Sequence, residues 1–411
     1  MQSTANDSAL GRYDILMAFP GRQLVADSAG MASGFLNALD TWWKTERTAR
    51  CKSELPFHGG WFVYLGYELA AEIEPTLKLR GDDVLPAAIA VRCPAALIRD
   101  HRQQRTYAVC EDSATDCIDI LEADLLAAAA SRSAGPISYA VHAICEDDPA
   151  CYLRAVRCAK DYIAAGDIFQ ANLSRGWSAN VLLSPADVYR RLADTNPAPF
   201  AGCARWQDRW IVSSSPERLL SIRDGIASTR PIAGTRPRSA VSEQDMKLSA
   251  ELIANHKERA EHIMLIDLER NDLGRICQAG SVEVDEMMVL ESYAHVHHIV
   301  SNVRGVLRTD VTPGMAIRAV FPGGTITGCP KIRCMEIIAE LEDSPRGAYT
   351  GSFGYLNRDG SLDLNILIRT IVMHGRALQL RAGAGIVADS DPEAELDETR
   401  AKARGLLQAV T

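Results

Sequence analysis

Apolar residues recur every three to four positions in several stretches of the chain, which is the spacing of a helix with one buried face. Residues 148–165 and 330–341 show this period, and the stretch 119–130 is rich in alanine, a strong helix former. All three are predicted to be helices, and the one at 330–341 is expected to have one apolar side.

A longer helix is predicted at residues 242–270. Ser242 with Asp245 resembles a capping box at its start, and a break is expected near His256. After the break the helix carries acids into an otherwise apolar interior.

Shorter apolar runs predict strands. They lie at residues 88–92, 167–177, 210–215, 217–223, 226–229, 352–356 and 362–373. Most follow one another through short turns instead of alternating strictly with helices. We therefore expect an α+β architecture with mixed or antiparallel sheets.

The domain organisation is predicted from one segment of linker-like composition, Ser-Arg-Ser-Ala-Gly-Pro at residues 131–136. It separates an N-terminal region, residues 1–135, which we expect to pack on a second domain at residues 145–408. A length of 411 residues also allows one large α/β unit.

Composition narrows the class of protein. Hydrophobic residues make up 47% and charged residues 24%, as in an ordinary globular protein. The net charge of −9 comes without a local basic patch, so we expect no nucleic-acid partner. No apolar run reaches membrane-spanning length and no leader precedes the chain, so a cytoplasmic protein is expected. The eleven cysteines include no Cys-x-x-Cys pair, which disfavours structural zinc.

Two of the predicted helices carry paired carboxylates. Glu258 and Glu261 are three residues apart and share one helical face. Glu395 and Glu398 repeat this spacing on a helix opened by Asp391 and a proline. Acids at this spacing are most often solvated helix faces. If the helices converge, their oxygens suit Mg²⁺, which takes one or two carboxylates together with substrate oxygens.

Glycine-rich or charged turns punctuate the second half of the chain. They lie at residues 213–218, 230–238, 321–331 and 383–390. Glycines let the backbone approach a ligand, and a helix start such as Gly-Cys-Pro-Lys ending at Lys331 attracts anions. Each of them, taken alone, could equally be a plain tight turn.

Together and in this order, these motifs resemble the chorismate-utilising enzymes, which include the large subunits of anthranilate synthase and aminodeoxychorismate synthase. The resemblance is strong over residues 149–407 and thinner before that, where it rests on residues 59–68. It implies large twisted sheets, mixed or antiparallel, packed as a sandwich with helices outside. It also implies a small dianionic substrate, chorismate.

The resemblance implies roles for the acids and for an anion-binding group. Mg²⁺ would be bound by Glu261 and Glu398, with Glu258 and Glu395 acting through water or as neighbours. The enolpyruvyl carboxylate of chorismate would be held by Arg369 with Tyr349, helped by the backbone amides of Gly383, Ala384 and Gly385. Lys402 would lie on the ligand side, although a solvated helix charge explains it nearly as well.

Further roles follow from the same resemblance. Glu217, in a Ser-Pro-Glu turn, would be the general acid or base at the C4 hydroxyl, with an exposed turn acid as the alternative. Among the histidines at 295, 297 and 298, the family pattern places only His298 in the site. Thr235 and Thr325 occupy motif positions that line the pocket.

Gln170 indicates the nucleophile. Isochorismate and salicylate synthases have a lysine at this strand position, as the base that activates water. A neutral glutamine cannot do this, so ammonia is expected to attack. Amination can then occur at C2, giving anthranilate after loss of pyruvate, or at C4, giving 4-amino-4-deoxychorismate.

The motifs conflict on this choice. Aminodeoxychorismate enzymes usually read Pro-Ile-Lys-Gly-Thr with a covalent lysine, whereas Ala233 stands here, as in anthranilate synthases, and cannot form an adduct. Residues 59–68, 321–328 and 351–356, with Asn172, resemble the aminodeoxychorismate subgroup. We therefore expect component I of aminodeoxychorismate synthase, a transferase of folate and para-aminobenzoate biosynthesis. Anthranilate synthase component I is the alternative, and a non-catalytic anion-binding relative is a remote one.

The expected partners follow from this chemistry. The sequence has no Gly-x-Cys-x-Gly nucleophile turn. We expect ammonia to come from a separate glutamine amidotransferase subunit.

Overall fold

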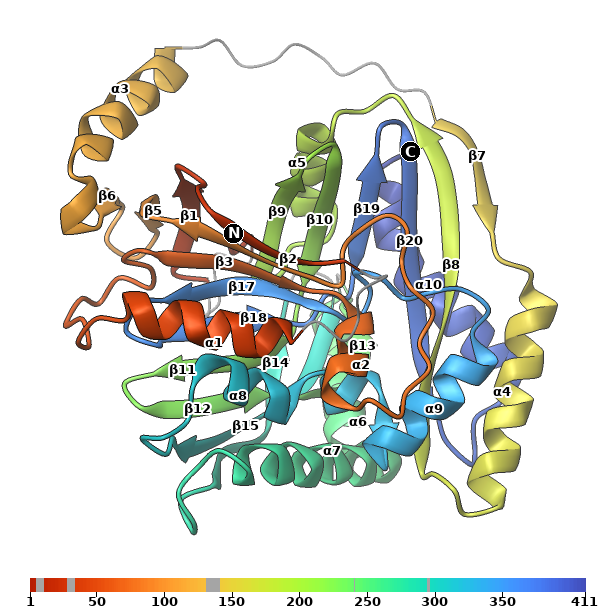
Figure 1. Ribbon diagram of the computed structural model, residues 1–411. Coiled ribbons are helices and arrows are strands. Elements are labelled where there is room, and N and C mark those ends of the chain that lie inside the picture. Colours follow the sequence, from red (N-terminus) through yellow and green to blue (C-terminus); the bar gives the residue numbers. More distant parts are fainter. Residues whose placement is uncertain (5–10, 28–33, 131–140, 240, 294–295) are drawn as a thin grey trace.

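The computed structural model describes residues 1–4, 11–27, 34–130, 141–239, 241–293 and 296–411. The described residues form sheets of seven, ten and three strands. In Figure 1 the strands of the seven-stranded sheet run steeply across those of the ten-stranded sheet, and helices lie outside both. Neighbouring strands pair antiparallel throughout the two large sheets. The predicted α+β class is confirmed.

The seven-stranded sheet carries the C-terminal end of the chain. Its order is β16 (Gly328–Cys329), β8 (Gln170–Val181), β20 (Ala377–Ile386), β19 (Thr370–His374), β10 (Arg209–Ser215) and β9 (Phe200–Trp206), with β7 (Val141–Glu146) also on β8. It packs against α4 (Pro149–Ala164), α5 (Pro185–Thr195), α9 (Lys331–Leu341) and α10 (Pro392–Gln408). Asp148 and Asp391 accept hydrogen bonds from amides in the first turns of α4 and α10, as their N-cap positions predict.

The ten-stranded sheet combines strands from the N-terminal region with strands from residues 218–365. Its order is β13 (Ile232–Pro237), β15 (Val296–Val306), β12 (Ile226–Arg230), β11 (Arg218–Arg223), β18 (Leu362–Asn365), β17 (Ser352–Asn357), β3 (Gly60–Leu65), β4 (Ala88–Cys93) and β2 (Gln23–Ala26), with β14 (Glu283–Ser292) on β15. The helices α1 (Phe35–Glu46), α7 (His256–Gly274) and α8 (Pro313–Val320) bury their apolar sides in the largest core cluster, together with this sheet.

Apolar side chains join the two large sheets. Tyr64 and Phe353 from the ten-stranded sheet pack in one cluster with Ile211 from the seven-stranded sheet. All three are buried, so the two sheets form a sandwich with a shared core.

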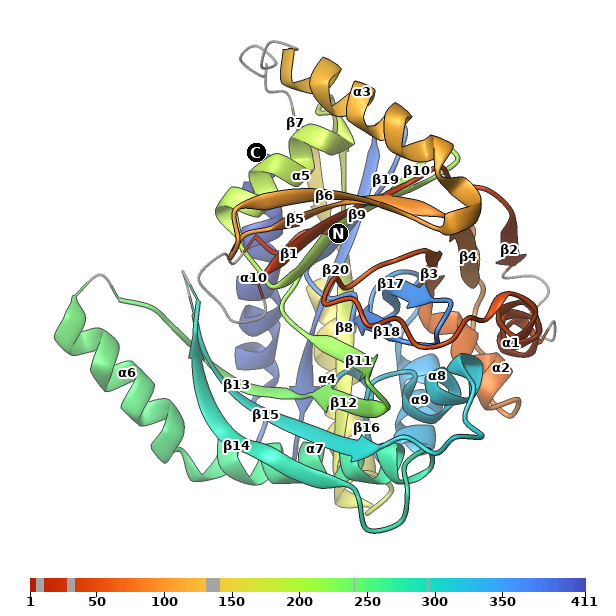
Figure 2. The same cartoon turned by 90° about the vertical axis from the view of Figure 1, so that its left-hand side faces the viewer.

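The N-terminal region adds a small separate sheet. Figure 2 shows β1 (Tyr13–Ala18), β5 (Ala95–Asp100) and β6 (Arg105–Cys110) above the ten-stranded sheet, with α3 (Asp116–Ala130) beyond them. Short helical turns, η2 (Tyr67–Leu69), α2 (Ala70–Ile73) and η3 (Asp112–Ala114), complete this region. The predicted linker at residues 131–136 lies outside the described residues. Among the described residues, no helix has the length and apolar character needed to cross a bilayer.

The run at residues 362–373, predicted as one strand, is two strands in different sheets. β18 ends at Asn365 in the ten-stranded sheet and β19 begins at Thr370 in the seven-stranded sheet. Between them Arg369 has a left-handed φ of 52°. Periodicity could not reveal this break because apolar residues continue on both sides of Arg369. The chain also crosses between the sheets at Glu217, where β10 leads into β11. Ile366 donates its amide to the Glu217 carbonyl, so the two crossings lie side by side.

The long helix at residues 242–270 is broken as predicted. α6 (Ser242–Ala254) and α7 (His256–Gly274) are separated by Asn255 in an extended conformation. The predicted capping box is wrong, because Ser242 is already helical and the N-cap, Val241, offers no side-chain oxygen. Asp245 instead accepts a hydrogen bond from the Ser239 amide at 2.9 Å.

Candidate active site

A cavity of about 750 Å³ lies at the crossings between the two sheets. Most residues predicted for the site line it, although they come from distant parts of the sequence. They are Gln170, Glu217, Ala233, Glu258, Glu261, His298, Thr325, Tyr349, Arg369, Gly383, Gly385, Glu395, Glu398 and Lys402.

Ala384 does not line the cavity. Its side chain is buried on the opposite face of β20, in a cluster with Tyr152. The Asn172 and Ser174 amides bond to Thr327 and Glu342, so they are not part of the β8–β20 ladder. In an antiparallel pair, successive residues of a strand direct their backbone N–H and C=O groups alternately toward one side and the other. Leu173, between Asn172 and Ser174, therefore directs its backbone groups toward its partner Ala384 in β20. The ladder bond therefore uses the Ala384 amide, and the prediction that this amide faces the ligand is wrong.

Thr235 can be placed only by its backbone. It pairs with His298 across β13 and β15. Its side chain, and its predicted hydroxyl contact, lie outside what the structure describes.

Glycine is required at two positions of the cavity wall. A Cβ on Gly383 would fall 2.6 Å from the Tyr349 hydroxyl and 2.6 Å from the Asn172 side-chain oxygen. A Cβ on Gly385 would collide with the Gln170 amide nitrogen. The two glycines leave room for polar side chains of the neighbouring strand and loop.

Two amide oxygens in the wall have no partner among the described residues. They are Oε1 of Gln170 and Oδ1 of Asn172, and both are buried. A buried acceptor without a donor is costly unless a ligand or water supplies one. Both oxygens can accept hydrogen bonds from N–H or O–H groups of a ligand.

Acids from α7 and α10 meet in the same cavity. Glu258 forms an ion pair with Arg236 at 3.0 Å, and Glu398 with Lys402 at 2.6 Å. The side chains of Glu261 and Glu395 also face the cavity.

The acids were tested as a metal site. In the described part of the chain, no three His, Cys, Asp or Glu side chains gather closely enough to hold a metal ion by themselves. Oxygen donors from two helices that line one cavity still fit Mg²⁺, which needs only one or two protein carboxylates when a substrate and water complete its shell. Glu261 and Glu398 would be those ligands.

Glu217 is held at the crossing between β10 and β11. Its amide donates to the Ser215 hydroxyl at 3.2 Å, and its side chain is 4% exposed. Burial raises the pKa of Glu217 to about 7, although the Ile232 amide and the Lys402 charge favour the carboxylate. Glu217 can therefore both donate and accept a proton near neutral pH.

The histidines of β15 point to opposite faces. His298 lines the cavity, and burial together with the Arg369 charge lowers the pKa of its imidazole to about 4, so it is neutral. His297 bonds instead to Ser292 at 2.7 Å and to Asp245 at 3.1 Å. These bonds fit the structural role that the family resemblance implied for His297. His295 lies outside the described residues.

Arg369 is a half-buried cation that lines the cavity. Burial lowers the pKa of its guanidinium, which the neighbouring Tyr349 and Glu398 partly offset. A guanidinium that faces a cavity favours a carboxylate ligand.

The structure places two further cations, Lys331 and Arg381. Of the two alternatives for the turn that ends at Lys331, anion binding or a plain turn, anion binding is not supported, because the Lys331 ammonium lies 2.5 Å from the buried Asp272 carboxylate. Arg381 on β20 lines the cavity as an additional cation. Arginines in strands are common, so no local signal marked it.

Comparisons with known proteins identify the family. The chain matches the chorismate binding enzyme family over residues 7–408. Anthranilate synthase component I-like protein of Synechocystis sp. is 43% identical over 409 residues, covering 98% of this chain and 83% of that protein. Aminodeoxychorismate synthase component 1 of Bacillus subtilis is 41% identical, covering 91% and 82%. The crystal structure of anthranilate synthase component I from Streptococcus pneumoniae superposes with a TM-score of 0.87 at 31% identity, covering 97% and 93%. The chain belongs to the chorismate binding enzyme family.

Proposed function

We propose that the protein is component I of an aminodeoxychorismate synthase, which converts chorismate and ammonia to 4-amino-4-deoxychorismate. The observation that carries the proposal is the single cavity in which Arg369, Glu217 and the acids of two helices meet. The sequence motifs at residues 59–68 and 351–356 favour this member of the family over its relatives.

Substrate binding follows from the charges of the cavity. Arg369 would bind the enolpyruvyl carboxylate, with the Tyr349 hydroxyl beside it. Bound between Glu261 and Glu398, Mg²⁺ would supply Lewis-acid activation of the ring carboxylate. Glu258 and Glu395 would orient water or neighbouring side chains around it.

Glu217 would drive departure of the C4 hydroxyl. In its protonated form it gives its proton to that oxygen, which leaves as water while an external nucleophile, ammonia or water, adds at C2. Ammonia then adds at C4, expels the C2 group and returns a proton to Glu217. Ala233 carries no amino group, so no covalent enzyme adduct takes part.

Gln170 would orient the nitrogen nucleophile. Its unpartnered Oε1 can accept an N–H bond from ammonia, but a neutral amide cannot deprotonate water. The neutral His298 would hold a ring hydroxyl by hydrogen bonding. Thr325 and Lys402 also line the cavity within reach of a ligand.

One residue favours a second candidate, anthranilate synthase component I. Ala233 lines the cavity where a lysine would form an adduct, and relatives with either name are about equally similar. Chromatography of the products from chorismate, ammonium and Mg²⁺ tests the choice. Aminodeoxychorismate is expected, and fluorescent anthranilate as the main product would refute it. Absence of chorismate consumption would leave only a non-catalytic relative.

The adduct route has a separate test. Mass spectrometry of Ala233→Lys with chorismate should reveal a covalent adduct if the position faces C2, whereas wild type should show none.

We also propose a glutamine amidotransferase partner, since ammonia is mostly ammonium at neutral pH. Relatives are named component 1, which implies a second component. Glutamine should replace ammonium only when that second protein is added. Turnover of glutamine by this chain alone would contradict the proposal.

A further inference from the structure

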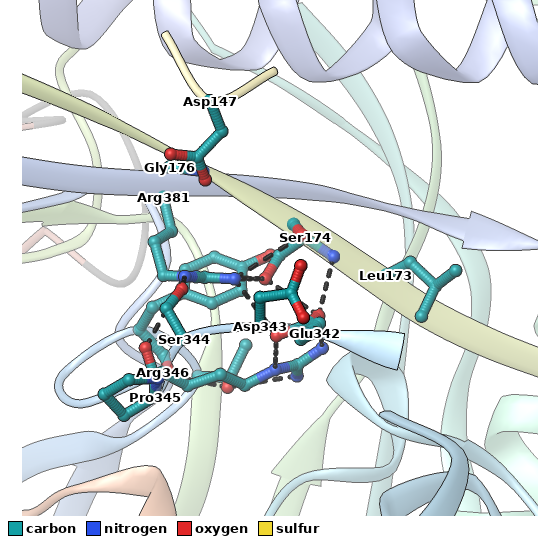
Figure 3. A network of polar contacts seen from close by, with 12 residues as sticks. Asp147, Leu173, Ser174, Gly176, Glu342, Asp343, Ser344, Pro345, Arg346 and Arg381 are labelled. Atoms are coloured by element: carbon teal, nitrogen blue, oxygen red, sulfur yellow. Dashed lines mark hydrogen bonds and ion pairs between the residues drawn. The ribbon is translucent and has the colours of Figure 1, made fainter. Parts of the chain in front are cut away.

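Behind one wall of the cavity lies a buried ion pair that the proposed mechanism does not use. Figure 3 shows Arg346 and Glu342 at its centre. Their side chains are 2% and 5% exposed and are joined by bonds of 2.6 and 3.0 Å. Neither residue lines the cavity, so neither is placed to touch the substrate.

Arg346 binds cavity-wall residues from three separate segments. Its guanidinium donates to the Asn172 carbonyl in β8 at 2.6 Å and to the Ile326 carbonyl in η4 (Gly324–Ile326) at 3.1 Å. It also lies 5.6 Å from the ring centre of Tyr349, within cation–π range. Asn172, Ile326 and Tyr349, hereafter the wall residues, all line the cavity. One side chain thus sets the spacing of three elements.

Glu342 extends the network to a fourth lining residue. It accepts hydrogen bonds from the Ser174 amide at 2.8 Å and from the Arg381 guanidinium at 3.1 Å. Burial alone would raise the pKa of Glu342, but the charges of Arg346 and Arg381 outweigh it and hold that pKa below its ordinary value. The carboxylate therefore stays charged and keeps both arginines in place.

The N-terminal region holds the same loop from the other side. Glu68 accepts hydrogen bonds from the amides of Arg346 at 2.8 Å and Gly347 at 3.1 Å. Arg346 also lies 4.8 Å from the ring centre of Tyr67. The motif at residues 59–68 thus supports the loop that carries Tyr349, although it does not reach the cavity.

We propose that Arg346 is a positioning residue that sets the geometry of the wall residues for chorismate binding without touching the substrate. The inference rests on the proposed function, because it assumes that Tyr349 and its neighbours bind chorismate. A planar guanidinium can bond to two carbonyls and a carboxylate at once, whereas a lysine ammonium cannot span them. Ordering these elements before substrate arrives is what would raise the affinity.

The test is the variant Arg346→Lys, with Arg333→Lys on α9 as the matched control. Arg333 is 39% exposed and pairs with Asp167 and Glu336 at the surface. Calorimetric titration with chorismate and Mg²⁺, without a nitrogen source, gives Kd independently of the product. We expect Kd to rise at least about tenfold in Arg346→Lys, because small displacements of binding groups have large effects. KM should rise in parallel with little change in kcat.

A merely structural role predicts a different result. Arg346→Lys would then lower Tm while Kd stayed as in wild type, and this outcome would overturn the proposal. If Arg346→Lys does not fold, Glu342→Gln serves instead, because it removes the charge that holds Arg346 but keeps one acceptor oxygen. An unchanged Kd in a folded Glu342→Gln protein would also overturn it.

Failure of the proposed function gives a separate signal. Anthranilate as the wild-type product would refute the aminodeoxychorismate assignment, and the Kd ratio would still decide the role of Arg346. If wild type binds no chorismate, both proposals fall.

Discussion

Two hollows of the molecule differ in how their charges are balanced. One is the candidate active-site cavity. The other, a second hollow of about 480 Å³, lies beside the hairpin turns of the ten-stranded sheet. There Arg218 binds Asp363 through two bonds of 2.9 Å, and His58 lies 3.4 Å from Asp359. Burial alone would raise the pKa of Asp359. Hydrogen bonds from His58, Ser361 and Cys51 outweigh burial and hold this pKa well below its usual range.

The candidate active-site cavity holds a carboxyl whose pKa is shifted in the opposite direction. Burial raises the pKa of Glu217 to about 7, and the side-chain oxygens of Gln170 and Asn172 are buried without partners among the described residues. Volume does not separate the two hollows strongly, and the second also has a buried polar atom without a partner among the described residues, Nε1 of Trp43. The pKa of a carboxyl in each hollow does separate them, since it is raised for Glu217 and lowered for Asp359. The predictions below challenge this contrast.

The largest effect is expected for Glu217→Gln. Removing the proton donor should lower kcat/KM for chorismate by roughly 10²- to 10⁴-fold. In wild type the acid form is present below pH 7 and is lost above it, so kcat/KM should fall as pH rises through about 7. Initial rates should be measured across pH 5.5–8.5, about the range that brackets this pKa. Wild type should show the fall in kcat/KM, and Glu217→Gln should not. An unchanged rate would remove Glu217 from the chemistry.

Glu217 should also affect stability with a definite sign. Its folded pKa of about 7 lies above the ordinary value, so its proton stabilises the folded state at acid pH. That contribution is lost as pH rises through about 7, and the loss should disappear in Glu217→Gln. Urea unfolding at two pH values measures it.

Removal of a metal ligand should have the next largest effect. Glu261→Gln is expected to lower chorismate consumption on the order of a hundredfold at limiting Mg²⁺. Asp267→Asn is the control, since Asp267 lies on the same helix but is 71% exposed. Rates of chorismate consumption measured over a Mg²⁺ titration test whether Glu261 binds the metal ion. Identical Mg²⁺ dependence in Glu261→Gln and wild type would contradict the proposed ligand.

A methyl group added at Gly383 tests whether the cavity needs the space that this glycine leaves. Gly383→Ala places a methyl group against the Tyr349 hydroxyl and the Leu173 carbonyl, each 2.6 Å from the new Cβ. KM should rise about tenfold, with a loss of unfolding free energy of about 1–3 kcal/mol. Gly274→Ala is the control, because no atom lies within 4 Å of its Cβ position. Equal KM values for both variants would refute a binding role for this wall.

The smallest effect on activity is expected in the second hollow. Asp359→Asn should cost about 1–2 kcal/mol of unfolding free energy at neutral pH and leave kcat/KM unchanged. Because the folded pKa of Asp359 is depressed, this difference should vanish as pH falls through the acid range, opposite to Glu217. Unfolding curves at neutral and acid pH test the sign. A large loss of activity would show that the second hollow also serves the reaction.

The sequence by itself determined the local elements and the family. Helical period and caps placed α4 and α10 correctly, because these depend on neighbouring residues. The spacing of Glu258 from Glu261 put both on one face of α7, and both line the cavity. The ordered motifs identified the chorismate-utilising family, which the family match confirms. Which member it is stays a proposal.

Tertiary structure decided which strands share a sheet and which polar groups find partners. In the run at residues 362–373 apolar residues continue on both sides of Arg369, so only long-range pairing with β11 and β10 shows that it changes sheets and exposes Arg369 to the cavity. The sequence left open whether the turn at Lys331 binds an anion, and the structure shows Lys331 paired with Asp272, 59 residues away. Local periodicity is set by adjacent residues, whereas strand partners and ion pairs are set by contacts between distant ones, which one sequence does not record.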